Sequence, residues 1–490
     1  MINNHPPHQS ILKAIAHREM LRRGFLPDFS SSVLGELNLI QSPAKPLSGD
    51  YRDLSNLLWC SIDNDDSLDL DQLTAAEAMP NGQTKILVAI ADVDSLVEMG
   101  SEIDRHALHN TSSVYTAAEI FPMLPEKLST NLTSLNLNED RLANVVEMVI
   151  KGDGSLLEYD VYPALVHNRA KLAYNRVASW LDGQDSIPEA VAVVPGLDAS
   201  LRMQDKAAQS MQVLRQANGA LSLETIEAKP VFDGDVLTDL EQDQKNRAKE
   251  IIENFMIAAN GATVQFLASR HFPSIRRVVR TPKRWERIVE VARDRGISLP
   301  ETPDSRALEA FLTDQKAANP QTFPDLSLTV IKLLGQGEYT AELPDTSPPG
   351  HFGLAVRDYT HSTAPNRRYP DLVTQRLLKA ALSGQASPYS IDELKALTLH
   401  FTRKEDDANK VERQVEKSAA ALLLADRIGE TFDAIVTGAA DKGTWVRLFS
   451  IPVEGKLVRG YEGQDVGDRL RVQLISVDVD QGFIDFQRKK

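Results

Sequence analysis

The sequence predicts a multidomain α/β protein, in which a mixed α/β domain lies between a small helical N-terminal unit and a C-terminal five-stranded β-barrel of the OB type. The chain has 490 residues, which is more than one ordinary hydrophobic core accommodates. From about residue 51 to 380, strand-like and helical runs alternate. After Gly429 the pattern changes to short strand-like runs separated by turn residues, which favours a small barrel.

The N-terminal unit is predicted to contain two short helices, over residues 9–25 and 33–40. Serines precede the second helix and offer side-chain oxygens for its free N–H groups. The segment SPAKPLSGD, residues 42–50, has the proline, glycine and serine content of a linker. We therefore assign residues 1–50 to this unit and its linker, either as a helix-turn-helix-like module or as a packing appendage.

Residues 51–390 are assigned to the central domain. Runs such as KILVAIADV (85–93) and VVEMVI (145–150) are typical of strands, and NRAKEIIENFMIAAN (246–260) predicts a helix. This mixture of elements indicates a domain with both a sheet and packed helices.

Residues 391–428 are polar and rich in Glu, Lys, Ala and Leu, so they predict a helical connector that closes the central domain. Residues 429–490 are assigned to the barrel. Its five expected strands lie in the runs TFDAIVTGA, GTWVRLF, VEGKLVRG, DRLRVQLISVDVD and GFIDFQ.

Composition and cysteine content exclude a membrane-spanning protein and a protein held together by internal disulfides. With 42% hydrophobic and 25% charged residues, the chain is typical of a soluble globular protein, and no apolar run is long enough to span a bilayer. The single cysteine, Cys60, can form no intramolecular disulfide and lies in an apolar run, which favours a buried thiol in a reducing compartment, the cytoplasm. The net charge of −15 decides little, because the excess acid lies in the middle of the chain and the two ends are near neutral.

The most informative stretch is IDNDDSLDLDQL, residues 62–73. Five aspartates fall within nine positions of it: Asp63, Asp65, Asp66, Asp69 and Asp71. Crowded carboxylates repel one another and raise each other's pKa unless a cation neutralises them. The run therefore favours a divalent-cation site over a solvated acidic loop.

The spacing excludes a calcium loop of EF-hand type. With Asp63 as the first position, the sixth position, which needs glycine, is Leu68, and the twelfth, which needs a bidentate glutamate, is Thr74. A magnesium or manganese site for phosphoryl chemistry remains. Two such cations bridged by carboxylates can activate a water and stabilise the leaving oxygen of a phosphodiester.

The spacing of Asp63, Asp69 and Asp71 resembles the signature of the RNB-type catalytic domain of the ribonuclease II/R family. The resemblance continues in order through IADVDSLVEMGSEID, NTSSVY, FPMLPEKLSTNLTSLN, DRLANVVEM, AKLAYNRVASWL, IIENFMIAAN and HFGLAVRDYTHSTAPNRRYPDLVTQRLLKA, and so covers about residues 58–380. The C-terminal barrel resembles the OB-fold RNA-binding module of the ribosomal-protein S-one type. Together they imply a hydrolytic 3′-to-5′ exoribonuclease that degrades single-stranded RNA processively to 5′-mononucleotides, with its active site deep in a narrow channel.

The resemblance also implies roles for individual residues in catalysis. Asp63, Asp69, Asp71 and the residue at position 72 match the ligands of magnesium, which manganese can replace. Asp71 is the carboxylate most closely tied to the chemistry, and Arg367 matches an arginine that meets the scissile phosphate. A fixed guanidinium stabilises the charge that develops on phosphate oxygens.

Four further residues are expected to contact RNA. Tyr115 and Tyr174 match tyrosines that hold the last nucleotides, since single-stranded bases stack on aromatic rings. Glu253 matches the acid that reads the ribose 2′-hydroxyl. Arg368 is expected either to bind backbone phosphate or to pair with an acid.

Two positions depart from the family pattern. A fourth aspartate normally follows Asp71, but Gln72 stands there, and its carbonyl brings no negative charge to a metal. Asp65 or Asp66 is a candidate to compensate for that loss. Leu223 occupies a place where relatives often have an aromatic residue, so the clamp on the terminal bases is expected to be looser.

Two alternative functions stay open on the sequence alone. One is an RNA-binding protein with a weakened nuclease core, which the departure at Gln72 suggests. The other is a metal-dependent phosphoesterase that acts on small molecules, which leaves the barrel without a use. The expected partner is single-stranded RNA, with no membrane association and a monomeric state.

Overall fold

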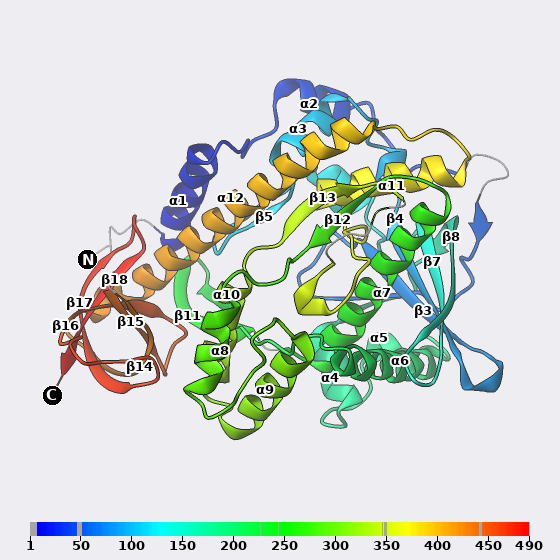
Figure 1. Ribbon diagram of the computed structural model, residues 1–490. Helices are drawn as coiled ribbons and strands as arrows, with labels where there is room; N and C mark the ends of the chain where they lie inside the picture. The colour runs from blue at the N-terminus through cyan, green and yellow to red at the C-terminus, as the bar shows by residue number, and fades with distance from the viewer. Residues whose placement is uncertain are drawn as a thin grey trace.

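The computed structural model describes residues 7–46, 51–225, 227–243, 245–344, 346, 350–440 and 443–489. A curved sheet with helices packed against it forms the body of the molecule, and a small barrel lies at the opposite end (Figure 1). One long helix, α12 (Ile391–Leu424), runs from the body to the barrel. The predicted combination of a mixed α/β domain, N-terminal helices and a C-terminal five-stranded barrel is confirmed.

The central sheet has seven strands in the order β1-β8-β7-β4-β3-β2-β9. Their bounds are Arg52–Asp53 (β1), Cys60–Asp63 (β2), Gln72–Ala78 (β3), Thr84–Ala91 (β4), Asp140–Ile150 (β7), Leu156–His167 (β8) and Ala170–Ala173 (β9). Most neighbours are antiparallel, but the short edge strands β1 and β9 run parallel to β8 and β2. The central strand β4 is buried from Ile86 onward, as its continuous apolar run predicts.

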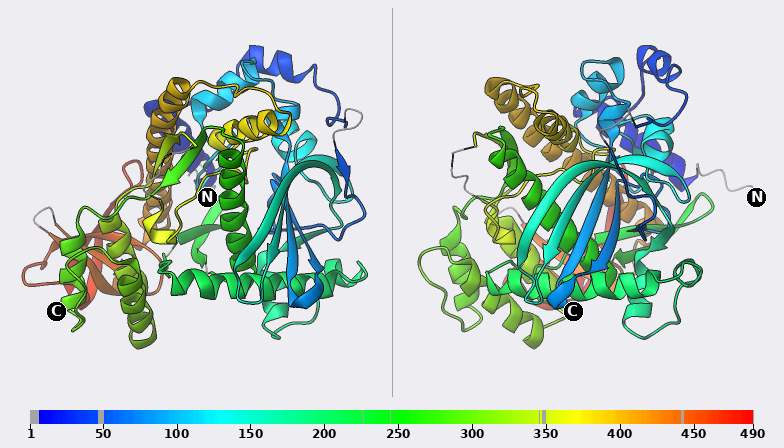
Figure 2. Two further views of the ribbon diagram at one scale, coloured as in Figure 1. Left: turned by 45° about the vertical axis from the view of Figure 1, so that its right-hand side comes forward. Right: turned by 90° about the vertical axis from the view of Figure 1, so that its right-hand side faces the viewer.

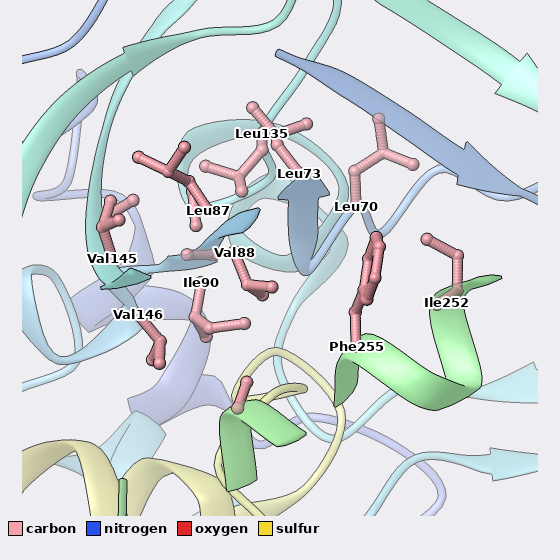
Figure 3. Close-up of a cluster of buried hydrophobic side chains, with 14 of the residues drawn as sticks. Leu70, Leu73, Leu87, Val88, Ile90, Leu135, Val145, Val146, Ile252 and Phe255 are labelled. Carbon is pink, nitrogen blue, oxygen red and sulfur yellow. The ribbon is translucent and has the colours of Figure 1, made fainter. Parts of the chain in front are cut away.

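Two long helices, α6 (Leu197–Ala217) and α7 (Arg247–Ser269), lie beside this sheet (Figure 2). Helix α7 begins after Asn246, whose side chain accepts a hydrogen bond from the Lys249 N–H. Its buried face carries Ile252 and Phe255 into the same apolar cluster as Leu70 (Figure 3). Leu70 lies inside the acidic run, so this packing fixes the run relative to α7.

The N-terminal helices pack on the body. These helices are α1 (His8–Arg22) and α2 (Ser31–Leu37). The elements that they contact include α3 (Glu102–Asn110) and β11 (Val236–Asp243), which pairs with β10 (Glu227–Asp233). Helix α1 lies along α12 and contacts β11, and α2 contacts α3. The Ser30 side chain accepts a hydrogen bond from the Val33 N–H, so the predicted serine cap of α2 is confirmed. The linker residues 47–50 lie outside the described residues.

Helices α8 (Trp285–Arg293), α9 (Ser305–Ala318) and α10 (Phe323–Leu334) share a hydrophobic core of their own. The closed barrel consists of Thr431–Ala440 (β14), Gly443–Leu448 (β15), Glu454–Arg459 (β16), Arg469–Asp478 (β17) and Phe483–Lys489 (β18). Arg447 of the barrel forms two hydrogen bonds with the Asp325 carboxylate of α10, at 3.1 and 2.7 Å. The three helices and the barrel are therefore joined by a charged contact.

Shorter elements complete the domain: β5 (Val114–Tyr115), β6 (Ile120–Phe121), α4 (Tyr174–Leu181), α5 (Glu189–Ala192), β12 (Ser274–Val278), β13 (Glu338–Glu342) and α11 (Tyr369–Leu382). Within the described ranges, no helix combines the length and the apolar character that crossing a bilayer requires.

Candidate active site

The acidic run forms a loop between β2 and β3 that is anchored at its C-terminal end. The Ser134 hydroxyl donates to the Leu68 carbonyl at 2.9 Å and accepts from the Leu70 N–H at 3.0 Å. The Leu135 N–H donates to the Leu70 carbonyl at 3.0 Å. Because Leu70 is buried in the core, its neighbours on either side in sequence are held at the edge of that core.

Asp71 is the most deeply buried of the aspartates in this run, with 1% of its surface exposed. One carboxylate oxygen accepts from the Asn366 backbone N–H at 2.9 Å, and the other accepts from Arg367 Nε at 3.3 Å. Burial raises the pKa of Asp71 to about 7, and the charges of Asp69 and Asp371 add to the rise, while Arg367 and the Asn366 N–H oppose it. The negative charge of this carboxylate is therefore only partly compensated within the protein.

Asp69 interacts electrostatically with both Asp63 and Asp71. Asp63 Oδ1 accepts from the Asn64 N–H at 2.8 Å and from the Ser67 hydroxyl at 2.9 Å. Burial raises the pKa of Asp63, although these hydrogen bonds and Arg367 act against the rise. Asp69 Oδ2 accepts a hydrogen bond of 2.9 Å from the Tyr115 hydroxyl.

Tyr174 is the first residue of α4, directly after β9, which pairs with β2. Its pKa is raised, first by burial and then by the negative charge of Asp63, while Arg367 opposes the rise. Six of the residues singled out in the sequence thus share one electrostatic environment: Asp63, Asp69, Asp71, Tyr115, Tyr174 and Arg367.

The other predicted site residues take different partners. Arg368 donates to Asp371 at 2.8 Å, so in this structure it pairs with an acid. Glu253 on α7 forms ion pairs with Arg215 at 3.7 Å and with Lys245 at 3.4 Å. Gln72, half-buried, begins β3 opposite Ile90.

The candidates for replacing the lost carboxylate at Gln72 are turned outward. Asp65 and Asp66 are both exposed, and Asp66 lies 3.7 Å from Lys229 of the β10–β11 hairpin. Leu223 packs against the hydrophobic core of α8, α9 and α10. The structure thus gives Leu223 a packing partner outside the acidic loop.

Residues near Arg367 in sequence serve structural roles. His361 Nδ1 lies 2.7 Å from the Tyr339 hydroxyl, and His351 Nδ1 accepts from the Leu354 N–H at 3.1 Å. Three arginines of the basic cluster RRVVRTPKR, residues 276–284, are paired with acids: Arg276 with Asp358, Arg277 with Glu405 and Arg280 with Glu338.

Sequence reasoning missed four groups at this site. They are the Asn366 backbone N–H, the Ser134 hydroxyl, the Glu412 carboxylate, which accepts from the Tyr115 N–H at 2.9 Å, and Lys171, which donates to the Ser67 carbonyl. Glu412 is separated from Tyr115 by 297 positions, and Asn366 from Asp71 by 295. No local pattern in one sequence reveals such pairs.

The donor set fits a divalent cation by its chemistry. Three carboxylates gather around one guanidinium, and burial raises the pKa of two of them, which indicates negative charge short of a counter-charge. In the orientations seen here the carboxylates face internal donors. Within the described ranges, no three acidic, histidine or cysteine side chains are arranged as a ready-made metal cage. The Asn64 and Ser67 donors both reach Asp63 on Oδ1, so the other oxygen of this carboxylate can meet a cation while they are kept, whereas both oxygens of Asp71 accept from the protein.

Comparison with known proteins agrees with this geometry. The family described as RNB domain matches residues 51–384, and the family described as RNase II-type exonuclease C-terminal S1 domain matches residues 430–489. Ribonuclease R of Aquifex aeolicus (strain VF5) is 29% identical over 507 residues, which cover 97% of this chain and 70% of that protein. Ribonuclease R of Escherichia coli (strain K12) is 30% identical over 89% of this chain, and the match spans 57% of its own length.

A solved structure shows the same architecture. RNase R of Mycoplasma genitalium, in complex with ribose-methylated single-stranded RNA, superposes with a TM-score of 0.87 at 25% identity, over 98% of this chain and 78% of that one. The RNB match covers more than half of this chain, and the S1 match follows it, in the expected order of catalytic domain and barrel. The chain therefore belongs to the RNB-domain family of ribonuclease II type.

Proposed function

We propose that this protein is a divalent-cation-dependent exoribonuclease that degrades single-stranded RNA from its 3′ end to 5′-mononucleotides. The observation that carries the proposal is the convergence of Asp69 and Arg367 on the buried Asp71, although Arg367 is separated from Asp71 by 296 positions. Carboxylates that lack a counter-charge beside a fixed guanidinium suit the binding of cation and phosphate together.

The reaction is the hydrolysis of the last phosphodiester. A water oxygen bonds to phosphorus, the bond from phosphorus to the 3′ oxygen of the preceding nucleotide breaks, and that oxygen takes up a proton. Asp63, Asp69 and Asp71 would hold the cation, with the Gln72 carbonyl beside them. When bound, magnesium or manganese supplies an activated water and neutralises charge on the leaving oxygen.

The chain's own side chains bind and orient the RNA. Arg367, with its side chain 41% exposed, is available to a phosphate once that phosphate enters beside Asp71. The rings of Tyr115 and Tyr174 stand beside the acidic loop and offer stacking surfaces to the terminal bases. Glu253 offers a carboxylate to a ribose 2′-hydroxyl if it exchanges its lysine and arginine partners for the sugar.

We also propose a separate role for each segment of the chain. Residues 51–390 carry the catalysis, residues 391–428 connect and close this domain, and residues 429–490 bind the incoming RNA. Residues 1–50 form a unit that packs on α12, as the contact between α1 and α12 supports. We place the protein in the cytoplasm as a monomer, and its single buried cysteine suits that reducing compartment.

Single-stranded RNA labelled at its 5′ end tests the activity. With magnesium, the 5′-labelled products resolved by length should shorten from the 3′ end, and a parallel substrate labelled at its 3′ end should release labelled mononucleotides from the first time point. Excess EDTA should stop the reaction. Undiminished cleavage in EDTA, or internal cuts as the first products, would contradict the proposal.

The second candidate is an RNA-binding protein with a weakened nuclease core, and the observation that favours it is Gln72 in place of a carboxylate. It predicts tight binding of the same RNA without shortening at any magnesium concentration. Parallel measurements of binding and of product length therefore separate the two.

A further inference from the structure

The N-terminal half of the acidic loop has an anchor that the catalytic assignment leaves unexplained. Lys171 of β9 donates a hydrogen bond from its ammonium to the backbone carbonyl of Ser67. Ser134 holds the other half of the loop, at Leu68 and Leu70. Two side chains from different strands and loops thus fix the two halves of the segment that carries the aspartates.

Strand pairing places this lysine on the same face of the sheet as Asp63. Strands β2 and β9 are parallel, with Ser61 opposite Lys171 and Asp63 opposite Ala173. Residues two positions apart in a strand, and residues opposite each other in neighbouring strands, share a face. The lysine side chain can therefore reach over the end of β2 to the loop that follows Asp63.

One residue, Ser67, connects Lys171 to the metal-ligand candidate Asp63. The lysine holds the Ser67 carbonyl, and the Ser67 hydroxyl donates to Asp63 Oδ1 at 2.9 Å. The segment between them is exposed at Asn64, Asp65 and Asp66, so the core does not hold it there. Fixing Ser67 by its carbonyl therefore helps to place its backbone at the position from which its hydroxyl reaches Asp63 Oδ1, together with the bond from its N–H to the Asn64 carbonyl.

We propose that Lys171 is a positioning residue for the divalent cation: by holding Ser67, it sets the geometry in which the Asp63 carboxylate meets the metal. This inference rests on the proposed function. Groups that orient metal ligands typically change metal affinity by about 10- to 100-fold when they are removed. The lysine acts through hydrogen bonding to the loop, so a guanidinium at the same position should replace it in part.

The test measures manganese binding to the RNA-free protein by calorimetry, alongside RNA cleavage. Lys171→Met keeps the length of the side chain but removes the donor, and it should weaken manganese binding by about tenfold or more. Lys171→Arg should restore most of the affinity. Lys206→Met, an exposed lysine on α6, is the matched control for loss of one charge and should bind as the wild type does. RNA binding in EDTA should be the same for all four proteins.

A double-mutant cycle with Ser67→Ala tests the route of the effect. If Lys171 acts through Ser67, the two substitutions together should cost little more manganese affinity than either alone. Additive losses would overturn the inference, as would an unchanged affinity in Lys171→Met. If Lys171→Met does not fold, Ser67→Ala and Lys171→Arg carry the test: no loss of affinity in Ser67→Ala overturns the inference. A wild-type protein that binds no manganese and cleaves no RNA refutes the proposed function instead.

Discussion

Replacing Asp71 with asparagine isolates the charge of the buried carboxylate from its shape. Asparagine keeps an oxygen that can accept from the Asn366 N–H, which lies 2.9 Å from Asp71 in the wild type. The change removes the negative charge beside Arg367 and the charge available to a cation. We expect RNA cleavage to be lost while RNA binding in EDTA stays within about twofold, since the tyrosines proposed to stack on RNA are untouched.

The expected size of the loss follows from what the cation contributes. Metal-assisted hydrolysis draws several kcal/mol of stabilisation from the ion, and with about 4 kcal/mol lost, turnover falls by about a thousandfold. Stability should change little. The lost ion pair joins the Arg367 side chain, which is 41% exposed, to the Asp71 carboxylate, which is 2% exposed, so its loss has a cost that is offset in part. The substitution also removes the cost of burying the charge.

Asp66→Asn is the matched control, because it makes the same change in an exposed residue of the same loop. Single-turnover cleavage of end-labelled RNA at saturating magnesium should give a near wild-type rate for this control and a rate lower by about three orders of magnitude for Asp71→Asn. Wild-type turnover in Asp71→Asn would refute the assignment of the site. An equal loss in both variants would show that total loop charge matters, rather than the position of Asp71.

Arg367→Ala should lower turnover by about a hundredfold or more, since one preorganised donor to the phosphate is lost, and a change below threefold in the same cleavage assay would contradict this role. Gln72→Asp should reach half-maximal activity at lower magnesium, because a carboxylate binds a hard dication more strongly than an amide oxygen; a higher magnesium requirement would mean that the added charge only repels its neighbours. Deleting residues 430–490 should weaken RNA affinity and flatten its dependence on salt, since phosphate contacts release counterions, and unchanged affinity and slope would assign the barrel another task. His106 is buried, and burial lowers its pKa to about 4, whereas the unfolded chain takes up the proton near pH 6.5. The neutral imidazole therefore contributes its full stability above pH 6.5, and this contribution is lost as the pH falls toward 4. Between pH 7 and pH 5.5, the free energy of unfolding of His106→Gln, measured in urea, should fall by about 1 kcal/mol less than that of the wild type. Equal decreases in the two proteins would contradict this prediction.

Much of the architecture was predictable because its signals are local. The apolar run KILVAIADV contains most of β4. The polar stretch predicted to be helical, residues 391–428, contains α12, which begins with a capping box between Ser390 and Glu393. The five barrel strands follow from short alternating runs between turns. Element ends were less predictable: the first helix ends at Arg22 instead of residue 25, since fraying and capping depend on neighbouring chain segments.

The partners of the site were not predictable in the same way. The spacing of the aspartates and the family resemblance indicated the candidate site residues, but not that the Asn366 N–H holds Asp71 or that Glu412 accepts from the Tyr115 N–H. The basic cluster at 276–284 illustrates the same limit, because the pairing of Arg276 with Asp358 depends on where a distant loop returns. A charge pattern shows that such groups exist, whereas their partners depend on long-range packing.

The sequence by itself determined the order of the domains and the identity of the acidic run, since both follow from neighbouring residues and their spacing, and its resemblance to the family marked the departure at Gln72. Only the tertiary structure decided that Asp71 is almost fully buried, that Asp66 faces solvent, and that Lys171 reaches the Ser67 carbonyl. The physical reason is that burial and hydrogen-bond geometry arise from contacts between segments hundreds of residues apart. Leu70 and Phe255 join the acidic loop and α7 in one apolar cluster, and the loop before α11 reaches Asp71 through the Asn366 N–H.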